Sequence, residues 1–181
     1  MKRTITMIAA VFAMLVLAST GHAQFGLTGT TSVAVTVAPE AALQVNTATS
    51  TLTAVAGTFA NNFLGTTSLT YKVRTTKVGG TGTITAKVTT DFGPAGGPSV
   101  ATPPTAGDTL GYTCTVTLPG TGCVGTATAS TAAATALATF GADAKSAKAG
   151  NAASLAWTLT NDPLYSTGSY TATVTFTISA T

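Results

Sequence analysis

The sequence predicts an all-β protein: an antiparallel, single-domain β-sandwich of Ig-like or pilin-like architecture. Apolar and polar residues alternate with a period of two along much of the chain, and turns rich in Gly and Pro separate the alternating runs. Threonine, a β-branched residue that favours strands, fills many of the polar positions. Eight to ten short strands of this kind are typical of two packed antiparallel sheets, and the long irregular connections favour Greek-key crossings.

The first 23 residues have the features of a secretory signal peptide. Basic residues at positions 2 and 3 precede an apolar run from Ile8 to Ala18, and small residues precede a cleavage site after Ala23. The apolar run is too short for a permanent membrane anchor, and Gln24 follows the site in place of a lipid-accepting Cys. We therefore expect a secreted mature chain, extracellular or at the cell surface, with no membrane span after cleavage.

Residues 24–38 are predicted to form an N-terminal arm, a candidate donor strand that precedes a sandwich domain at residues 39–181. Val33, Val35 and Val37 share one face of an alternating run, and the arm carries no charge. Such an arm can complete a sheet edge in a neighbouring subunit, or it can pair within its own domain. The sequence leaves both alternatives open.

Alternating runs further along the chain predict strands at residues 68–74, 83–88, 110–118, 122–129 and 154–160. The Gly-rich residues 79–82 predict a hairpin that joins the first two of these strands. The Ala-rich residues 131–138 are compatible with one short helix.

The C-terminal run is the clearest strand in the sequence. Tyr170, Val174, Phe176 and Ile178 alternate with hydroxyl residues, and the run is uncharged, which makes it a candidate acceptor or terminal strand. The apolar residues of the predicted strands are expected to form the core: Leu69, Tyr71, Val73, Ile84, Val88, Val116, Leu155, Trp157, Tyr170, Val174 and Phe176. Trp157 is interpreted as a core residue and not as a platform for sugar stacking.

Cys114 and Cys123 are predicted to form a disulfide, because a secreted protein folds in an oxidising compartment. Pro119 and Gly120 fit the central positions of a turn, so the two cysteines are expected on adjacent arms of one hairpin. No basic residue lies nearby in sequence to stabilise a reactive thiolate. The pair is therefore interpreted as a structural cross-link.

The composition of the mature chain argues against several classes of function. It has no His, and its six basic and five acidic residues leave a net charge of +1. Without His, neither a Ser-His-Asp nor a Cys-His arrangement is available, so we expect no enzymatic activity and no cofactor. A calcium site using Asp143, Asn161 or Asp162 is conceivable, but no Asp-rich calcium loop is present and no metal site is predicted. Six scattered cations do not form the basic stripe that nucleic acid requires.

Both ends of the mature chain resemble a known family. The run from Gly168 to Phe176 resembles the final strand of bacterial pilin and spore-coat-U-type sandwich domains, in which Gly-x-Tyr precedes alternating Val and Thr. Residues 31–37 resemble the alternating arm that such subunits insert into a neighbour. The resemblance implies a secreted subunit that assembles by strand exchange. The chain departs from the family in its cysteines, because the disulfide of those pilins usually ties distant strands.

These observations favour a non-enzymatic extracellular structural subunit: a pilus, filament or biofilm-matrix component whose partners are copies of itself or other surface components. A monomeric surface adhesin or carbohydrate-binding β-sandwich is the alternative. Ice binding is a lower alternative. It is suggested by Thr-x-Thr triplets at residues 115–117 and 173–175, but these show no regular period.

Overall fold

The computed structural model describes residues 28–54 and 59–181 and divides the chain into two units, Met1–Thr36 and Val37–Thr181. The predicted signal peptide and residues 24–27 of the arm lie outside the described residues. Residues 28–36, the described part of the first unit, are all exposed and belong to no strand or helix. No described strand pairs with residues 31–37, so pairing of the arm within its own domain, one of the two alternatives, is not seen among the described residues.

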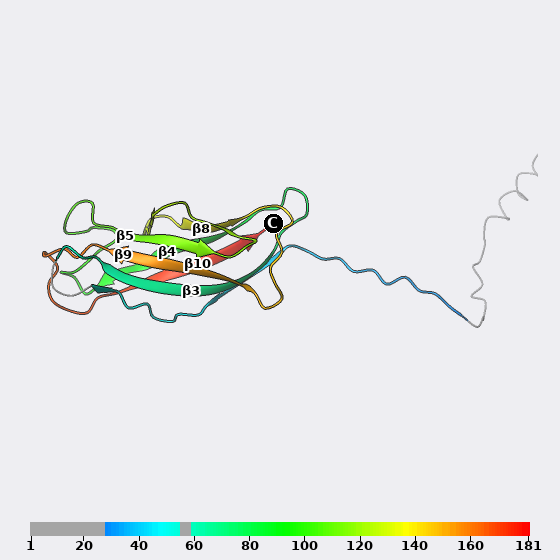
Figure 1. Ribbon diagram of the computed structural model, residues 1–181, viewed down its shortest axis with the longest axis horizontal. Helices are drawn as coiled ribbons and strands as arrows, with labels where there is room; N and C mark the ends of the chain where they lie inside the picture. The colour runs from blue at the N-terminus through cyan, green and yellow to red at the C-terminus, as the bar shows by residue number, and fades with distance from the viewer. Residues whose placement is uncertain (1–27, 55–58) are drawn as a thin grey trace, which may run out of the picture. The chain divides into compact units, whose positions relative to one another are not determined.

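The described part of the second unit contains ten β-strands and no helix (Figure 1). The strands are β1 (Glu40–Val45), β2 (Thr53–Ala54), β3 (Phe63–Arg74), β4 (Gly82–Gly93), β5 (Leu110–Val116), β6 (Thr121–Gly122), β7 (Ala127–Thr128), β8 (Thr135–Phe140), β9 (Asn151–Leu159) and β10 (Thr171–Ala180). The all-β fold class predicted from the sequence is confirmed.

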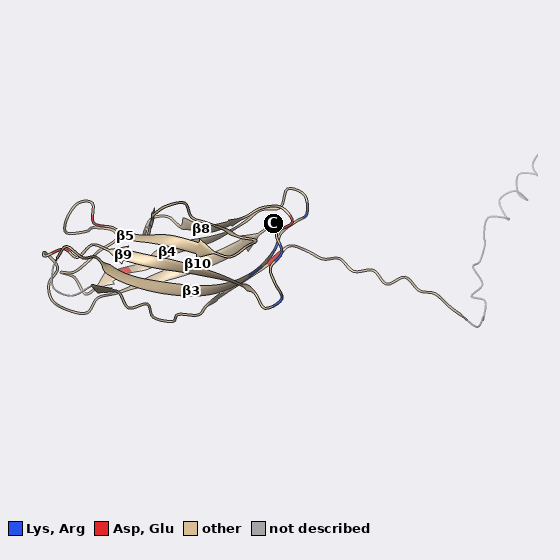
Figure 2. Ribbon diagram, in the orientation of Figure 1, with Lys and Arg blue, Asp and Glu red and all other residues tan. Residues whose placement is uncertain are grey.

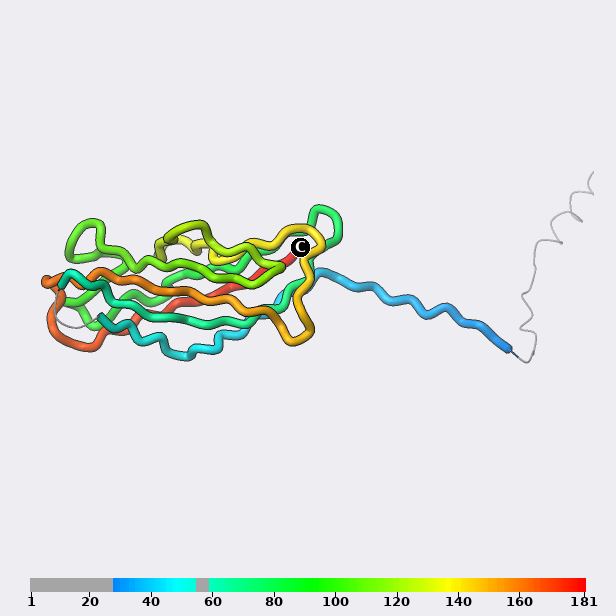
Figure 3. Tube along the Cα trace, in the orientation of Figure 1, coloured from blue at the N-terminus to red at the C-terminus, as the bar shows by residue number. Residues whose placement is uncertain are grey.

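The strands form two antiparallel sheets (Figure 3). The first sheet has the order β1-β3-β9-β5-β7, with β2 pairing with the early part of β3. The second sheet has the order β10-β4-β8-β6. Consecutive strands β3 and β4 lie in different sheets, and so do β5 and β6, so the chain crosses between the sheets at both connections.

These crossings contradict both hairpins expected from the sequence. Residues 79–81 belong to a connection between sheets and Gly82 begins β4, while the two cysteines lie on segments of opposite sheets instead of on paired arms. A turn does form between the cysteines, where the Gly120 N–H donates to the Thr117 carbonyl at 3.3 Å. The hydroxyl of Tyr71 also donates to that carbonyl and accepts from the Gly120 N–H, so a buried core residue holds the turn. Alternation shows which face of a strand is buried, but it does not identify the neighbouring strand.

Two other expected elements differ in the structure. Residues 135–140 form β8, so the short helix at residues 131–138 is wrong. Leu137 and Phe140 are fully buried from this strand, and that burial outweighs the helix preference of the alanines. The strand expected at residues 122–129 is broken into β6 and β7, which pair with different sheets.

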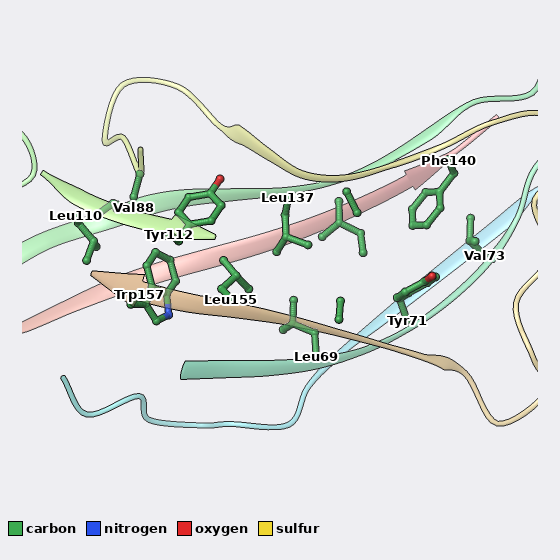
Figure 4. Packing of buried hydrophobic residues seen from close by; sticks show 14 of the residues in the cluster. Leu69, Tyr71, Val73, Val88, Leu110, Tyr112, Leu137, Phe140, Leu155 and Trp157 are labelled. Carbon is green, nitrogen blue, oxygen red and sulfur yellow. The ribbon is translucent and has the colours of Figure 1, made fainter. Parts of the chain in front are cut away.

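The core lies between the two sheets (Figure 4). Alternate residues of β3, β4 and β9 are buried, as the period of two requires. Tyr112 packs edge-on against Trp157 with ring centroids 5.2 Å apart, and Tyr71 lies at the same distance from Phe140. The Trp157 indole N–H donates to the Thr67 hydroxyl at 2.8 Å, so the one buried indole has a partner.

Most of the predicted core residues are buried as expected: Leu69, Tyr71, Val73, Ile84, Val88, Leu155 and Trp157. Val116, Val174 and Phe176 pack against the core but are only partly buried. Tyr170 precedes β10 and is not part of the core cluster. Its ring lies against Gly97, where an added Cβ would come within 2.2 Å of Cε1, and its hydroxyl donates to the Ser166 carbonyl at 2.7 Å. Tyr170 therefore holds two loops together.

Candidate functional site

The valines of the predicted donor strand are exposed in the single chain. Val33, Val35 and Val37 are 92%, 85% and 62% exposed. Residues 28–38 contain no charged side chain. An uncharged, alternating segment of this kind has no apolar contact of its own and is suited to pair with a sheet edge.

β10 is the long free edge of the second sheet. Its register pairs it with β4 from Thr171↔Gly93 to Ala180↔Gly82, and its other side has no partner strand among the described residues. The other sheet edges are shorter, because β6 and β7 have two residues each and β1 and β2 share one edge with a gap between them. Of the edges in the described part of the chain, β10 thus offers the longest free ladder.

The inward side chains of β10 are incompletely covered. Ala172, Val174, Phe176, Ile178 and Ala180 alternate with exposed hydroxyl residues, and each is partly buried against the core. A central strand such as β9 buries its inward row fully. The exposed part of the β10 row is therefore apolar surface that an additional strand could cover.

The neighbouring edge strand β1 lies beside β10 on the same side of the sandwich. Its inward residues, Ala41 and Leu43, are also only partly buried. The two sheets thus leave the core less covered on the side where β1 and β10 form their edges.

β10 lacks the features that usually protect an edge. No charged residue lies between position 163 and the last residue described, and β10 contains no proline. Proteins normally place charges or prolines on an edge to prevent pairing with other chains. On its paired side, hydroxyls join it to β4: Thr83 to Ser179 at 3.2 Å and Thr89 to Thr175 at 3.0 Å. β10 is therefore unpaired on one side and firmly hydrogen-bonded to β4 on the other.

The disulfide joins the two sheets. Cys114 lies on β5, opposite Leu155 of β9, while the N–H of Cys123, just after β6, donates to the Leu137 carbonyl of β8 at 3.0 Å. The Cα atoms of the two cysteines are 5.4 Å apart. The predicted pairing is confirmed, but its role is to tie facing sheets and not the arms of one hairpin.

A hollow of about 490 Å³ lies between the loop after β4 and the loop before β10. Asp91 organises the first of these loops. Its carboxylate accepts hydrogen bonds from the Phe92, Val100 and Ala101 N–H groups and from the Ser99 hydroxyl, all at 3.0 Å or less. Partial burial raises the pKa of Asp91, but these four hydrogen bonds outweigh it and hold that pKa below its usual range.

The remaining acids near this hollow are also engaged in the fold. Thr105 donates its hydroxyl to Asp162, and the Leu164 N–H donates to the same carboxylate at 2.8 Å; both hydrogen bonds lower the pKa of Asp162. Burial, followed by the nearby charge of Asp108, raises the pKa of Tyr165, whose hydroxyl donates to Asp108 at 3.2 Å. At neutral pH Asp162 is therefore ionised and the Tyr165 phenol is protonated.

Asp143 donates its N–H to the Thr76 carbonyl just after the end of β3, whereas Asp162 follows the end of β9, which pairs with the start of β3. The two acids therefore lie at opposite ends of the sandwich, and a calcium site that uses both is excluded. Among the described residues, no three side chains of His, Cys, Asp or Glu gather as they would around a metal ion. The described part of the chain also contains no helix with the length and hydropathy to cross a bilayer.

Comparisons with family models, with curated proteins and with solved structures give no significant match to this chain. The free edge of β10 and the exposed arm are therefore the features from which a function can be inferred.

Proposed function

We propose that this chain is a secreted, non-enzymatic structural subunit of pilin-like type, a component of a pilus, filament or biofilm matrix. Copies of the chain assemble by strand exchange: the arm of one copy adds to the β10 edge of the next. The observation that carries this proposal is the match between an exposed, uncharged, alternating arm and a ten-residue uncharged edge with an incompletely covered apolar row. A disulfide is also in keeping with an oxidising compartment.

The period of two determines how the arm must lie. In an antiparallel pair, directly opposite residues point to the same face of the sheet. Val35 therefore lies opposite Val174 or Phe176, with Val33 and Val37 two places to either side. A slip by one residue would turn all three valines to the solvent. Burying three valines contributes roughly 4–7 kcal/mol before the cost of ordering the arm.

The experiment is electron microscopy of the purified mature protein with one charge placed on either face of the arm. Val35→Asp puts a carboxylate on the buried face and should abolish filaments. Ala34→Asp is the matched control, because it adds the same charge one residue away on the outward face, and filaments should persist. Both variants lie in the first unit, so their melting temperatures should equal that of the wild-type protein.

The alternative function is a monomeric adhesin or carbohydrate-binding sandwich, and the hollow near Asp91 is the feature that favours it. A wild-type protein that remains monomeric at high concentration, and whose melting temperature rises with a glycan, would establish this alternative and contradict the fibre. Equal filament formation by Val35→Asp and Ala34→Asp would contradict strand exchange by the arm.

A further inference from the structure

The two ends of the sandwich carry opposite charge (Figure 2). One end, where β3 and β10 finish and β1 begins, has five cations and two carboxylates, hence a net charge of +3. The carboxylates form ion pairs, Glu40 with Arg74 at 3.0 Å and Asp143 with Lys145 at 2.7 Å. The net charge of this basic end therefore comes from the remaining cations: Lys72, Lys77 and Lys148.

The opposite end, where β4 and β9 finish and β5 and β10 begin, has three carboxylates and no cation among its described residues, hence a net charge of −3. These are Asp91, Asp108 and Asp162. The last cation, Lys87, lies midway along β4 and is opposite Thr175. The charge of the mature chain is thus small in sum but separated along the strand direction.

Each end also has an apolar feature: an exposed valine at the basic end and a hollow at the acidic end. At the basic end, Val78 is 84% exposed on the turn between β3 and β4, next to Lys77. At the acidic end, the hollow of about 490 Å³ has a mixed lining, in which apolar side chains (Phe92, Pro94, Pro98, Pro104 and Leu164) lie beside polar ones that include Asp91. A protruding valine beside a lysine thus has, at the opposite end of the molecule, a hollow whose wall contains apolar side chains and a carboxylate.

We infer that the turn at residues 76–79 of one copy seats in the acidic-end hollow of the next copy, with Val78 against the apolar side chains of its wall. This inference rests on the proposed function, in which copies follow one another in a fibre. Lys77 then lies near the carboxylates of the acidic end, where opposite charge favours the approach. A contact between two different patches is heterologous, so it repeats along a fibre without closing on itself.

The head-to-tail direction of this contact agrees with the direction in which the arm would pair with β10. The arm joins the sandwich at the basic end, where the Arg74 Nε–H donates to the Ala38 carbonyl at 2.8 Å. β10 runs from the acidic end to the basic end. When the basic end of one copy meets the acidic end of the next, the arm therefore runs antiparallel to the β10 of that copy. Ten arm residues, 28–37, span about 33 Å when extended, the length of a ten-residue strand such as β10.

The test is site-directed disulfide formation in the full mature chain. Val78→Cys and Leu164→Cys are prepared separately, mixed, allowed to assemble and oxidised mildly, and the products are analysed by non-reducing gel and mass spectrometry. Leu164 is 64% exposed, so both substitutions should leave the fold intact. We expect a 78–164 heterodimer in the mixture and a ladder of multimers from the double variant. In the control mixture, Val45→Cys replaces Val78→Cys. Val45 is also exposed, at 46%, but it lies on β1 and not on the turn at residues 76–79. This mixture should give no heterodimer.

A second variant, Val78→Ser, should raise the critical concentration for assembly roughly tenfold or more at an unchanged melting temperature. If the wild-type protein forms filaments, but the mixture of cysteine variants gives no 78–164 product and Val78→Ser assembles normally, the end contact is overturned and the proposed function stands. A 78–164 product from a protein that forms no filaments would support the end contact and count against the fibre. Absence of both filaments and product would overturn both.

Discussion

Asp91 shows how much a single side chain contributes to the loops at the acidic end. Its two carboxylate oxygens share four donors: the N–H of Phe92 at the end of β4, and the Val100 N–H, the Ala101 N–H and the Ser99 hydroxyl in the loop beside the hollow. Hydrogen bonds to an ionised acceptor are stronger than neutral ones. Because the loop at residues 94–109 contains three glycines and four prolines but little regular structure, this one carboxylate fixes much of its shape.

Asp91→Asn should lower the free energy of unfolding by about 1–3 kcal/mol at neutral pH, because the neutral amide is a weaker acceptor and directs its own N–H groups toward donors. The wild-type carboxyl has a lowered pKa in the folded state, so its contribution is fully present above pH 3.8, its ordinary value, and is lost as the pH falls through the folded value. Urea unfolding at pH 6, 4, 3 and 2 measures this: the variant should lose less stability on acidification than the wild type.

The matched control is Asp143→Asn. That carboxylate is exposed and paired with Lys145, and surface pairs contribute little. An Asp91→Asn protein as stable as the wild type at pH 6, or with the same acid sensitivity, would contradict the role assigned to Asp91.

The strands differ in how well the sequence predicted them. β5, β9 and β10 were expected in nearly their observed positions, because their period of two shows where one face is buried. β3 and β4 were expected at residues 68–74 and 83–88, but each is 12 residues long. β8 was missed, since it is short, alanine-rich and buries both Leu137 and Ala138 in succession. No local signal distinguishes such a segment from a helix.

Strand pairing was the other part that the sequence could not supply. The chain does reverse near Gly79 and near Pro119, but each reversal leads to the facing sheet instead of the adjacent strand. The turn between the cysteines runs from Thr117 to Gly120, so its central residues are Leu118 and Pro119 and not Pro119 and Gly120 as expected. The candidate site, too, could be predicted only in part from the sequence. The arm and the terminal strand were recognisable from alternation and lack of charge, whereas the free edge of β10 depends on its pairing with β4, about 90 positions away.

The disulfide is the covalent link between elements of opposite sheets. Replacing both cysteines by alanine should lower the free energy of unfolding by about 2–3 kcal/mol, because the unfolded chain regains the freedom of a short closed loop. Urea unfolding of the double variant measures the loss, and reduction of the wild-type protein should reproduce it. Equal stability of the oxidised and reduced wild-type proteins would contradict this contribution.

At the scale of the molecule, one core belongs to both sheets. Tyr71, Leu155 and Trp157 face it from the first sheet, and Ile84 and Leu137 from the second. Neither sheet keeps its inner face covered when the other is removed, so the second unit should unfold as one cooperative domain. The expected result is that Trp157 fluorescence and far-UV circular dichroism give the same midpoint in the Val35→Asp protein, which keeps assembly out of the measurement. Two separated midpoints would show that the sheets are independent.

The pairing of β10 with β4 also has a consequence for the order of folding. Thr81 donates its N–H to the hydroxyl of Thr181, a residue 100 positions later. As the chain emerges during synthesis, β4 is complete long before β10 exists, and one side of β4 stays unpaired for that interval. Closing so long a segment is slow, and an unpaired strand is vulnerable to pairing with another chain while it waits. The time before the last strand arrives, more than the finished fold, is therefore when this protein most needs to be kept apart from its own copies.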